Sequence, residues 1–325
     1  MTDRMTMAEA LNSALAEALE RDDTVFLLGE DIIDPGGGTF KVTAGLSTRY
    51  GRERVRETPI SEQAIVGAAI GAAMTGMKPV AEIMMADFQA VCLDQVANHA
   101  AKLRYMSGGR TTVPMVVRSA FTGGMGAAAQ HSQSVEAWLA HTPGLKVAIP
   151  STPADAKGIL ATAIDDPDPV IVLEPATLYA VAGPVPRGEH RVPVGAGEVR
   201  RAGTDATVIT YGAQVQDALA VAEELAEEIS VEVIDLRWIM PWDVELVVSS
   251  VAKTRRAVVV HQAVRQCGFG AEIVSTVTER LWGVLEQPIL RVAAQNTPVP
   301  FSAPLERAHL PGREEIADAI RSLTK

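Results

Sequence analysis

Short apolar runs alternate with segments of helical periodicity along the first half of the chain. In residues 6–21, apolar side chains recur every four residues, which predicts an amphipathic helix with Thr6 as its N-cap. Further helices are predicted at residues 46–50, 87–105, 134–140 and 153–164. The apolar runs have the continuity of strands that are buried on both faces, and they cover residues 25–29, 80–84, 114–118, 146–149 and 169–174.

The second half repeats this pattern after a polar stretch that contains Pro and Gly, residues 184–198. Strands are predicted at residues 206–210, 230–235 and 257–261, and helices at 215–228, 242–250 and 271–281. Alternating strands and helices predict parallel sheets with helices on both faces. The fold class is therefore α/β, with two doubly wound parallel-sheet domains at residues 1–185 and 186–325.

One stretch departs from the usual amphipathic pattern: residues 58–71, TPISEQAIVGAAIG. Gly and Ala fall on all faces of its predicted helix, which allows other groups to approach the backbone closely. Two interpretations of Glu62 remain open. It is either an acid that favours the positive end of the helix, with Ser61 as the cap, or a carboxylate at the mouth of a buried helix that addresses a ligand.

His131 follows a glycine-rich loop, Gly123–Gly126, near an expected strand end. A lone histidine is most often structural, but a flexible loop can deliver a side chain whose ordinary pKa suits proton transfer. A Ser-His-Asp triad that uses Ser132 or Ser134 is excluded because the chain has no GxSxG elbow. The chain also lacks a GxGxxG fingerprint and a P-loop, which excludes those two nucleotide-binding motifs.

Composition narrows the classes of partner. The 325 residues are 47% hydrophobic and 21% charged, and the net charge is −11, which argues against nucleic-acid and anionic-membrane surfaces. Cys92 and Cys267 lack metal-ligand spacing and indicate reduced thiols. The N-terminal residues do not resemble a signal peptide, and no apolar run reaches membrane-span length, so we expect a cytoplasmic protein.

A family resemblance rests on six motifs that occur in a fixed order. Together they closely resemble the beta subunit of the thiamine-diphosphate-dependent decarboxylating component of 2-oxo acid dehydrogenase complexes, in the transketolase superfamily. That family includes pyruvate, branched-chain and acetoin dehydrogenases. The motifs are GED (29–31), TPISEQAIVGAAIGAAMTGMKPVAEI (58–83), DQVANHAAKLRYMSGG (94–109), HSQS (131–134), PGLKVAIPSTPADAKG (143–158) and DPDPVIVLEPATLY (168–179).

The resemblance implies a transketolase-like pyrimidine-binding domain followed by a transketolase C-terminal domain. It assigns Glu62 to the aminopyrimidine N1′ of thiamine diphosphate, Phe88 to the side of that ring, and His131 to the active site. Met115, Ala163, Asp166 and Asp168 match positions that ring a potassium ion in relatives, largely through main-chain carbonyls. Met84 and Met85 replace the Gln-Phe of branched-chain members, which favours a pyruvate or acetoin substrate.

The resemblance also implies partners. The GDG motif that holds Mg²⁺ and the diphosphate in this superfamily is absent from the chain, so an alpha subunit is expected to supply that half of the site in an α₂β₂ heterotetramer. A lipoyl acyltransferase core is expected to bind the C-terminal domain. Acetoin cleavage, acyloin-forming carboligation and a non-catalytic scaffold role remain alternatives, and the combined presence of Glu62, Phe88 and His131 argues against the scaffold.

Overall fold

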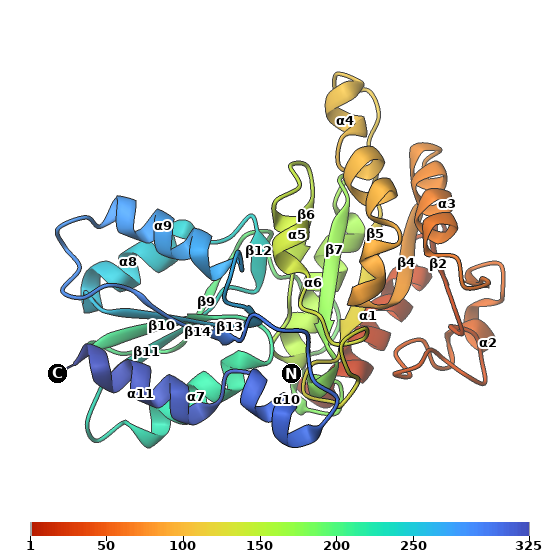
Figure 1. The fold of residues 1–325 in the computed structure, drawn as a ribbon. Coiled ribbons are helices and arrows are strands. Elements are labelled where there is room, and N and C mark those ends of the chain that lie inside the picture. The colour runs from red at the N-terminus through yellow and green to blue at the C-terminus, as the bar shows by residue number, and fades with distance from the viewer. Residues whose placement is uncertain (1, 325) are drawn as a thin grey trace. The chain divides into compact units, whose positions relative to one another are not determined.

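The computed structural model describes residues 2–324, which form two compact units (Figure 1). Unit 1 contains the chain up to Phe121 and Trp138–Val194, and unit 2 contains Thr122–Ala137 and the chain from Gly195 onward. The segment Thr122–Ala137, which precedes most of α5 (Glu136–Ala140), therefore belongs to the unit that is formed mainly by later residues. The predicted domain boundary at residues 185 and 186 stays a prediction.

The sheet of unit 1 is parallel, as the apolar runs predicted. Its strands lie in the order β6-β7-β5-β4-β2-β3, and every neighbouring pair in that series is parallel. Their bounds are β2 (Val25–Gly29), β3 (Val55–Glu57), β4 (Lys78–Met85), β5 (Val116–Phe121), β6 (Lys146–Ala148) and β7 (Val170–Pro175).

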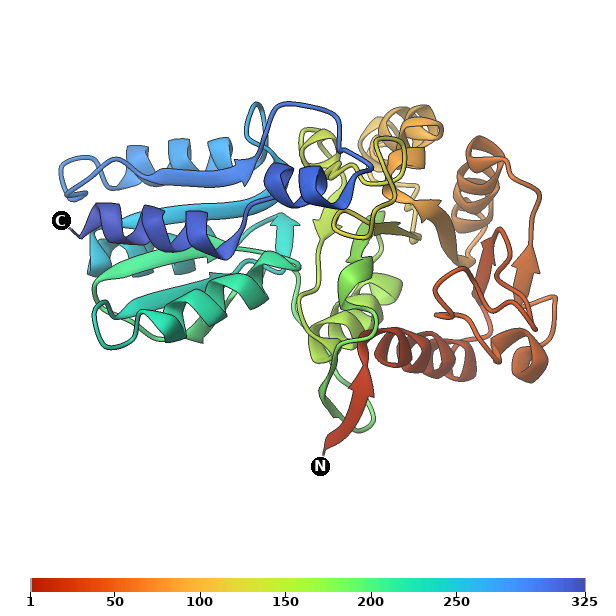
Figure 2. The same cartoon turned by 60° about the horizontal axis from the view of Figure 1, so that its bottom comes forward.

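Helices cover this sheet. On one side, α1 (Met7–Arg21) packs along α6 (Pro153–Asp165), and Figure 2 shows the red α1 beside the green α6. The predicted cap of α1 is confirmed, because the Thr6 hydroxyl accepts the Glu9 amide and the Glu9 carboxylate accepts the Thr6 amide. The predicted helix α2 (Leu46–Tyr50) is also present, and α3 (Glu62–Met74) packs against β4.

Two predictions in unit 1 differ from the structure. The strand predicted at residues 80–84 begins earlier, because Lys78 and Pro79 already belong to β4, where a proline is tolerated near the start of a strand. Residues 87–105 do not form one helix: a 3₁₀ turn, η1 (Ala86–Ala90), precedes a π-helix, η2 (Gln95–Ala100), and a short α4 (Leu103–Met106). The π turn inserts residues that a regular helical period does not accommodate.

Another element of unit 1 was not predicted. Strand β1 (Thr2–Thr6) pairs antiparallel with β8 (Ala182–Pro186), and the short 3₁₀ turn η3 (Ala176–Leu178) follows β7. The amides of Met7 and Ala8 also donate to carbonyls of Val181 and Tyr179, at 3.0 and 3.1 Å. The start of α1 is thereby fixed to the chain that leaves β7.

Unit 2 has its own sheet, in the order β14-β13-β10-β11-β9. The three pairs from β14 to β11 are parallel, as predicted, whereas β9 runs antiparallel to β11 and was not predicted. The bounds are β9 (Glu198–Arg201), β10 (Ala206–Thr210), β11 (Val231–Asp235), β13 (Ala257–Val264) and β14 (Leu290–Ala294), with a short β12 (Trp238–Met240) after β11.

Helices cover both faces of this second sheet, which confirms the doubly wound architecture. Figure 1 shows α8 (Val244–Thr254) and α9 (Gly270–Arg280) on one face, and α7 (Gln214–Glu224) and α11 (Arg313–Leu323) on the other. A further helix, α10 (Ala303–His309), precedes α11. The core between the sheet and the α7/α11 layer is aliphatic and includes Val208, Val221, Val233, Val260 and Ile320.

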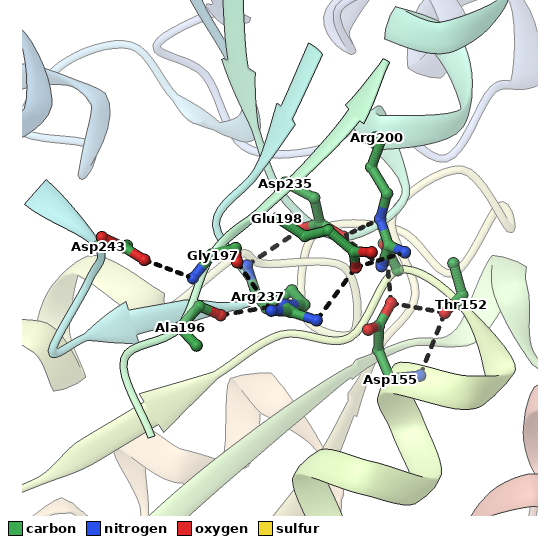
Figure 3. Close-up of polar contacts among 10 residues, drawn as sticks. Thr152, Asp155, Ala196, Gly197, Glu198, Arg200, Asp235, Arg237 and Asp243 are labelled. Carbon is green, nitrogen blue, oxygen red and sulfur yellow. Dashed lines mark hydrogen bonds and ion pairs between the residues drawn. The ribbon is translucent and has the colours of Figure 1, made fainter. Parts of the chain in front are cut away.

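Two arginines fix the chain where unit 2 begins (Figure 3). Arg200 Nη1 lies 2.7 Å and Arg237 Nη1 3.1 Å from the same Glu198 oxygen, and Arg237 also donates to the carbonyls of Ala196 and Gly197. Asp243 accepts the Gly197 amide at 3.1 Å. Ionic and backbone contacts therefore hold the segment that leads into β9.

No helix in the part of the chain that the structure describes is long and apolar enough to cross a membrane.

Candidate active site

Glu62 is the first residue of α3 and is buried, with 8% of its surface exposed. A carboxylate in this position meets the partial positive charge of the helix N-terminus. The predicted capping role of Ser61 is wrong, because its side chain makes no cap hydrogen bond and its hydroxyl donates to the Pro59 carbonyl at 3.1 Å instead. Glu62 is thus the acidic side chain of the first turn of α3.

The helix behind Glu62 is buried on one face and exposed on the other. Ile65, Val66 and Ile70 are buried, whereas Ala64 and Ala68 are exposed. The small residues on the outer face therefore do not serve close packing within this chain.

Glu30 lies directly after β2 and is as buried as Glu62, with 8% exposed. Burial raises the pKa of Glu30, and the negative charges of Glu62, Asp31 and Glu82 raise it further. Its Oε1 atom is buried without a hydrogen-bond partner in the described chain. A buried carboxyl with an open oxygen is costly unless a ligand completes it.

A second unsatisfied polar group lies at the same edge of the sheet. Thr58 follows β3, and its amide donates to the carbonyl of Gly29, the last residue of β2, at 2.9 Å. Its hydroxyl is buried without a partner in the described chain. The carboxyl ends of β2 and β3 thus present an open hydroxyl and an open carboxyl oxygen near Glu62, and a polar heterocycle such as an aminopyrimidine fits these groups.

Phe88 lies in the 3₁₀ turn η1, directly after β4. Its neighbours Asp87 and Gln89 are buried, and the Gln89 amide donates to the Ser119 hydroxyl at 2.6 Å, whereas Phe88 itself is half-buried. The turn is therefore anchored while part of the Phe88 surface stays accessible. Met84, at the end of β4, accepts a hydrogen bond from the Thr39 hydroxyl at 3.2 Å.

The structure also contains a buried ionic cluster that was not predicted. Arg118 in β5 donates two hydrogen bonds of 2.7 Å to Glu174 in β7 and one of 2.8 Å to Glu82 in β4. Tyr179 donates to Glu174 at 2.6 Å. Burial raises the pKa of Tyr179 far above its ordinary value, so its phenol stays protonated and donates. Charged residues inside apolar strands were the only sequence signal of this cluster.

The predicted cation-site residues lie together at one end of the unit 1 sheet. The Met115 carbonyl accepts the Val170 amide at 3.0 Å, and the Ala163 carbonyl accepts the Asp166 amide at 3.3 Å. Asp166 also accepts the amide of Asp168 at 2.9 Å. These contacts bring the end of α6 and the start of β7 close to the start of β5.

The two carboxylates of this group already have cationic partners. Lys146 lies 2.7 Å from Asp166 and 3.3 Å from Asp168, and Arg104 lies 2.8 Å from Asp168. The side-chain oxygens of Asp166 and Asp168 are therefore already engaged, and the potassium site stays a prediction. Within residues 2–324, no group of three or more His, Cys, Asp or Glu side chains is arranged to hold a metal ion.

His131 belongs to unit 2 and is half-buried, in the segment that precedes α5. Its carbonyl accepts a short hydrogen bond from the Thr122 hydroxyl, and its amide donates to the Ala128 carbonyl at 3.3 Å. The next residue, Ser132, is buried and its hydroxyl has no partner in the described chain. His131 therefore lies on the loop between β5 and α5, and its assignment to the active site stays a prediction.

Comparison with known families covers most of the chain. Residues 3–181 match "Transketolase, pyrimidine binding domain" and residues 195–316 match "Transketolase, C-terminal domain". Among solved structures, a "Split gene transketolase, inactive beta4 tetramer" shares the fold with a TM-score of 0.80 at 22% identity, covering 98% of each chain. The transketolase from Leishmania mexicana matches all of this chain with a TM-score of 0.73 at 16% identity, over 46% of its own length.

Curated relatives match over nearly their full length. The "Acetoin:2,6-dichlorophenolindophenol oxidoreductase subunit beta" of Cupriavidus necator is 44% identical and is covered over 99% of its length by all of this chain. The "Pyruvate dehydrogenase E1 component subunit beta" of Bacillus subtilis is 42% identical, with 98% of each chain covered. The chain therefore belongs to the family of E1 beta subunits of the 2-oxo acid dehydrogenases, which are built on the transketolase fold.

Proposed function

We propose that this chain is the beta subunit of an enzyme that oxidatively decarboxylates pyruvate or a related 2-oxo acid and transfers the acyl group to a lipoyl carrier. The observation that carries the proposal is the pair of buried carboxyls Glu30, directly after β2, and Glu62, at the start of α3. The Glu30 Oε1 atom and the Thr58 hydroxyl there have no partner in the described chain. Family membership supplies the reaction class.

Thiamine diphosphate, when bound, supplies the electron sink for decarboxylation. Glu62 would hold a proton at N1′ of the aminopyrimidine, which favours the tautomer that can accept a proton at its exocyclic nitrogen. Phe88, on its anchored turn, would contact the side of that ring. Glu30, whose pKa is raised by burial, would stay protonated more readily and would help to keep a proton available to Glu62.

His131 would act in the second half-reaction. Imidazole side chains commonly transfer protons in enzymes, and backbone hydrogen bonds hold the loop that carries His131. We propose that it orients the lipoyl sulfur and manages a proton during acyl transfer.

The missing half of the cofactor site is assigned to an alpha subunit. The chain has no GDG motif, so Mg²⁺ and the diphosphate would be held by that partner in an α₂β₂ heterotetramer. The C-terminal domain would bind a lipoyl acyltransferase core, and the assembly would work in the cytoplasm. Affinity purification from the source cell tests this composition, and recovery of the chain without an alpha subunit would contradict it.

A potassium ion is proposed at Met115, Ala163, Asp166 and Asp168, held by main-chain carbonyls because Lys146 and Arg104 already pair with the carboxylates. Its expected role is to stiffen the turn between α6 and β7. Thermal unfolding in equal concentrations of potassium chloride and choline chloride is the test, and identical midpoints would remove the ion from the account.

A second substrate has specific support. The Cupriavidus necator acetoin enzyme subunit is 44% identical to this chain. The pyruvate enzyme subunit of Staphylococcus epidermidis is also 44% identical to it. Acetoin cleavage therefore stands beside pyruvate decarboxylation, and acyloin-forming carboligation or a scaffold role remains a weaker alternative.

Turnover of the chain, co-expressed with its alpha subunit, distinguishes these functions. Pyruvate, branched-chain 2-oxo acids and acetoin should each be tested with an artificial electron acceptor and with a lipoyl domain. Activity with pyruvate or acetoin that requires both subunits supports the proposal. If the intact assembly turned over none of these substrates, the result would support the non-catalytic scaffold role.

A further inference from the structure

The loop that carries His131 needs glycines for its shape. Gly124 has φ of 94° and Gly126 has φ of 71°, a region that L side chains rarely adopt. A Cβ atom at Gly123 would lie 2.0 Å from the Gln262 side-chain nitrogen. The loop therefore packs closely against Gln262 at this end. A side chain at position 123 would require the loop or Gln262 to move.

Glu306 in α10 binds this loop directly. One carboxylate oxygen accepts the Gly124 amide at 2.9 Å and the Gly126 amide at 3.3 Å, and the other accepts the Gly126 amide at 3.0 Å. Only 4% of Glu306 is exposed. Hydrogen bonds from amides to a buried carboxylate are charge-assisted and stronger than neutral ones.

The charge of Glu306 has no cationic side chain to balance it within residues 2–324, since no lysine or arginine pairs with it. His309 is close on the same helix, but burial lowers the pKa of His309, so its ring is neutral at neutral pH. The two glycine amides therefore provide the main stabilisation of this carboxylate. Removing either side of the contact would leave a buried polar group unsatisfied.

The far end of the loop is also tied to unit 2. Tyr211, directly after β10, donates to the Glu136 carboxylate at 2.9 Å, and both side chains are buried. In addition, the Thr122 hydroxyl at the start of the segment donates to the His131 carbonyl. His131 thus lies on a segment that is held at both ends and across its base.

We infer that Glu306 is a positioning residue that holds the glycine-rich loop, and through it His131, in the geometry needed for acyl transfer. The inference rests on the proposed role of His131. Glu306 acts on the loop backbone and does not itself touch the reacting groups, so its loss should disturb the step that uses His131 more than the step that uses Glu62.

Hydrogen exchange of the full chain tests the contact itself. In Glu306→Ala the amides of Gly124 and Gly126 should exchange about 10- to 100-fold faster, because each loses a charge-assisted acceptor. The exchange rates in Glu306→Gln should lie between those of the parent chain and those of Glu306→Ala, since glutamine keeps one acceptor oxygen. Glu315→Ala is the matched control: that carboxylate also accepts a glycine amide, from Gly312 at 3.3 Å, but far along the chain from the loop.

Activity of the enzyme assembled with its alpha subunit tests the consequence. Glu306→Ala should lower acyl transfer to a lipoyl domain about 10-fold or more while decarboxylation with an artificial acceptor falls less, and Glu306→Gln should recover part of the loss. Unchanged exchange at residues 122–130 would overturn the contact. Faster exchange with equal loss of both activities, or of neither, would overturn the positioning role.

A separate variant identifies a failure of the proposed function. If His131→Ala leaves acyl transfer intact while Glu306→Ala accelerates exchange, the loop contact stands and the proposed role of His131 is wrong. Exchange in β10 and β13 must stay unchanged in Glu306→Ala, since faster exchange there would mean that unit 2 has lost stability as a whole and would contradict a local role.

Discussion

Glu30 and Glu62 are both buried, and the negative charge of Glu62 adds to the effect of burial in raising the pKa of Glu30. The protonated form of Glu30 is therefore favoured over its charged form. A buried carboxyl of this kind suits the proton handling that the proposed chemistry requires of the pyrimidine-binding half.

Glu62→Gln should therefore abolish most of the decarboxylation. We expect a loss of at least about 100-fold with an artificial electron acceptor, because the amide cannot exchange a proton with the cofactor. Circular dichroism should be unchanged, since Gln preserves size and polarity. Glu57→Gln, an exposed acid in β3, is the control and should retain activity. A wild-type rate in Glu62→Gln would reduce Glu62 to a residue that begins a helix.

The raised pKa of Glu30 has a consequence for stability. The folded state binds this proton more tightly than the unfolded state, so the contribution of Glu30 to stability is lost as the pH rises from its ordinary pKa of 4.5 through the folded value. Glu30→Gln cannot ionise. The difference in stability between Glu30→Gln and the parent chain should therefore favour the variant more at pH 8 than at pH 4, as measured by thermal unfolding. A difference independent of pH would show that Glu30 is not perturbed.

The Arg118 cluster should dominate the stability of unit 1. Arg118→Met leaves Glu82 and Glu174 buried without their cation, and loss of one partner of a buried ion pair typically costs about 3–5 kcal/mol. Chemical denaturation measures this cost. Arg21→Met removes an exposed pair with Asp165 and should cost less than about 1 kcal/mol. Similar losses in the two variants would contradict the burial argument.

His131→Ala should separate the two half-reactions. Proton transfer by a positioned side chain contributes roughly 10²–10⁴-fold, so acyl transfer to a lipoyl domain should fall by that order. Decarboxylation with an artificial acceptor should suffer less, because it depends on Glu62. Both rates should be measured on the same preparation, and circular dichroism should confirm that the fold is intact. Equal losses would place His131 in decarboxylation, and no loss would make it structural.

Local sequence signals predicted the regular elements well. The strand Ala206–Thr210 and the helix Leu46–Tyr50 have the predicted bounds, because each is a compact apolar or helix-forming run between turn residues. Thr6 was predicted as the N-cap of α1, and the structure adds Glu9 as its partner in a capping box. The prediction of one helix at residues 87–105 was wrong because the apolar spacing there is compatible with a regular helix, and the π turn is apparent only in the folded chain.

The arrangement of the site was less accessible. Glu62 and His131 were singled out from motifs, and their roles stay predictions. The contact between Glu306 and Gly124 joins residues 182 positions apart, and no local pattern indicates it. The Arg118 cluster depends on the register of three strands, which sets which charges face each other. Pairings of this kind come from the folded sheet rather than from neighbouring sequence.

The central claim is that this chain holds one half of a thiamine diphosphate site and needs an alpha subunit for the other. Calorimetric titration of the cofactor with Mg²⁺ tests it most directly, first into the isolated chain and then into the chain assembled with its alpha subunit. We expect no saturable binding to the isolated chain up to about 1 mM and tight binding to the assembly. Micromolar, Mg²⁺-dependent binding to the isolated chain would contradict it.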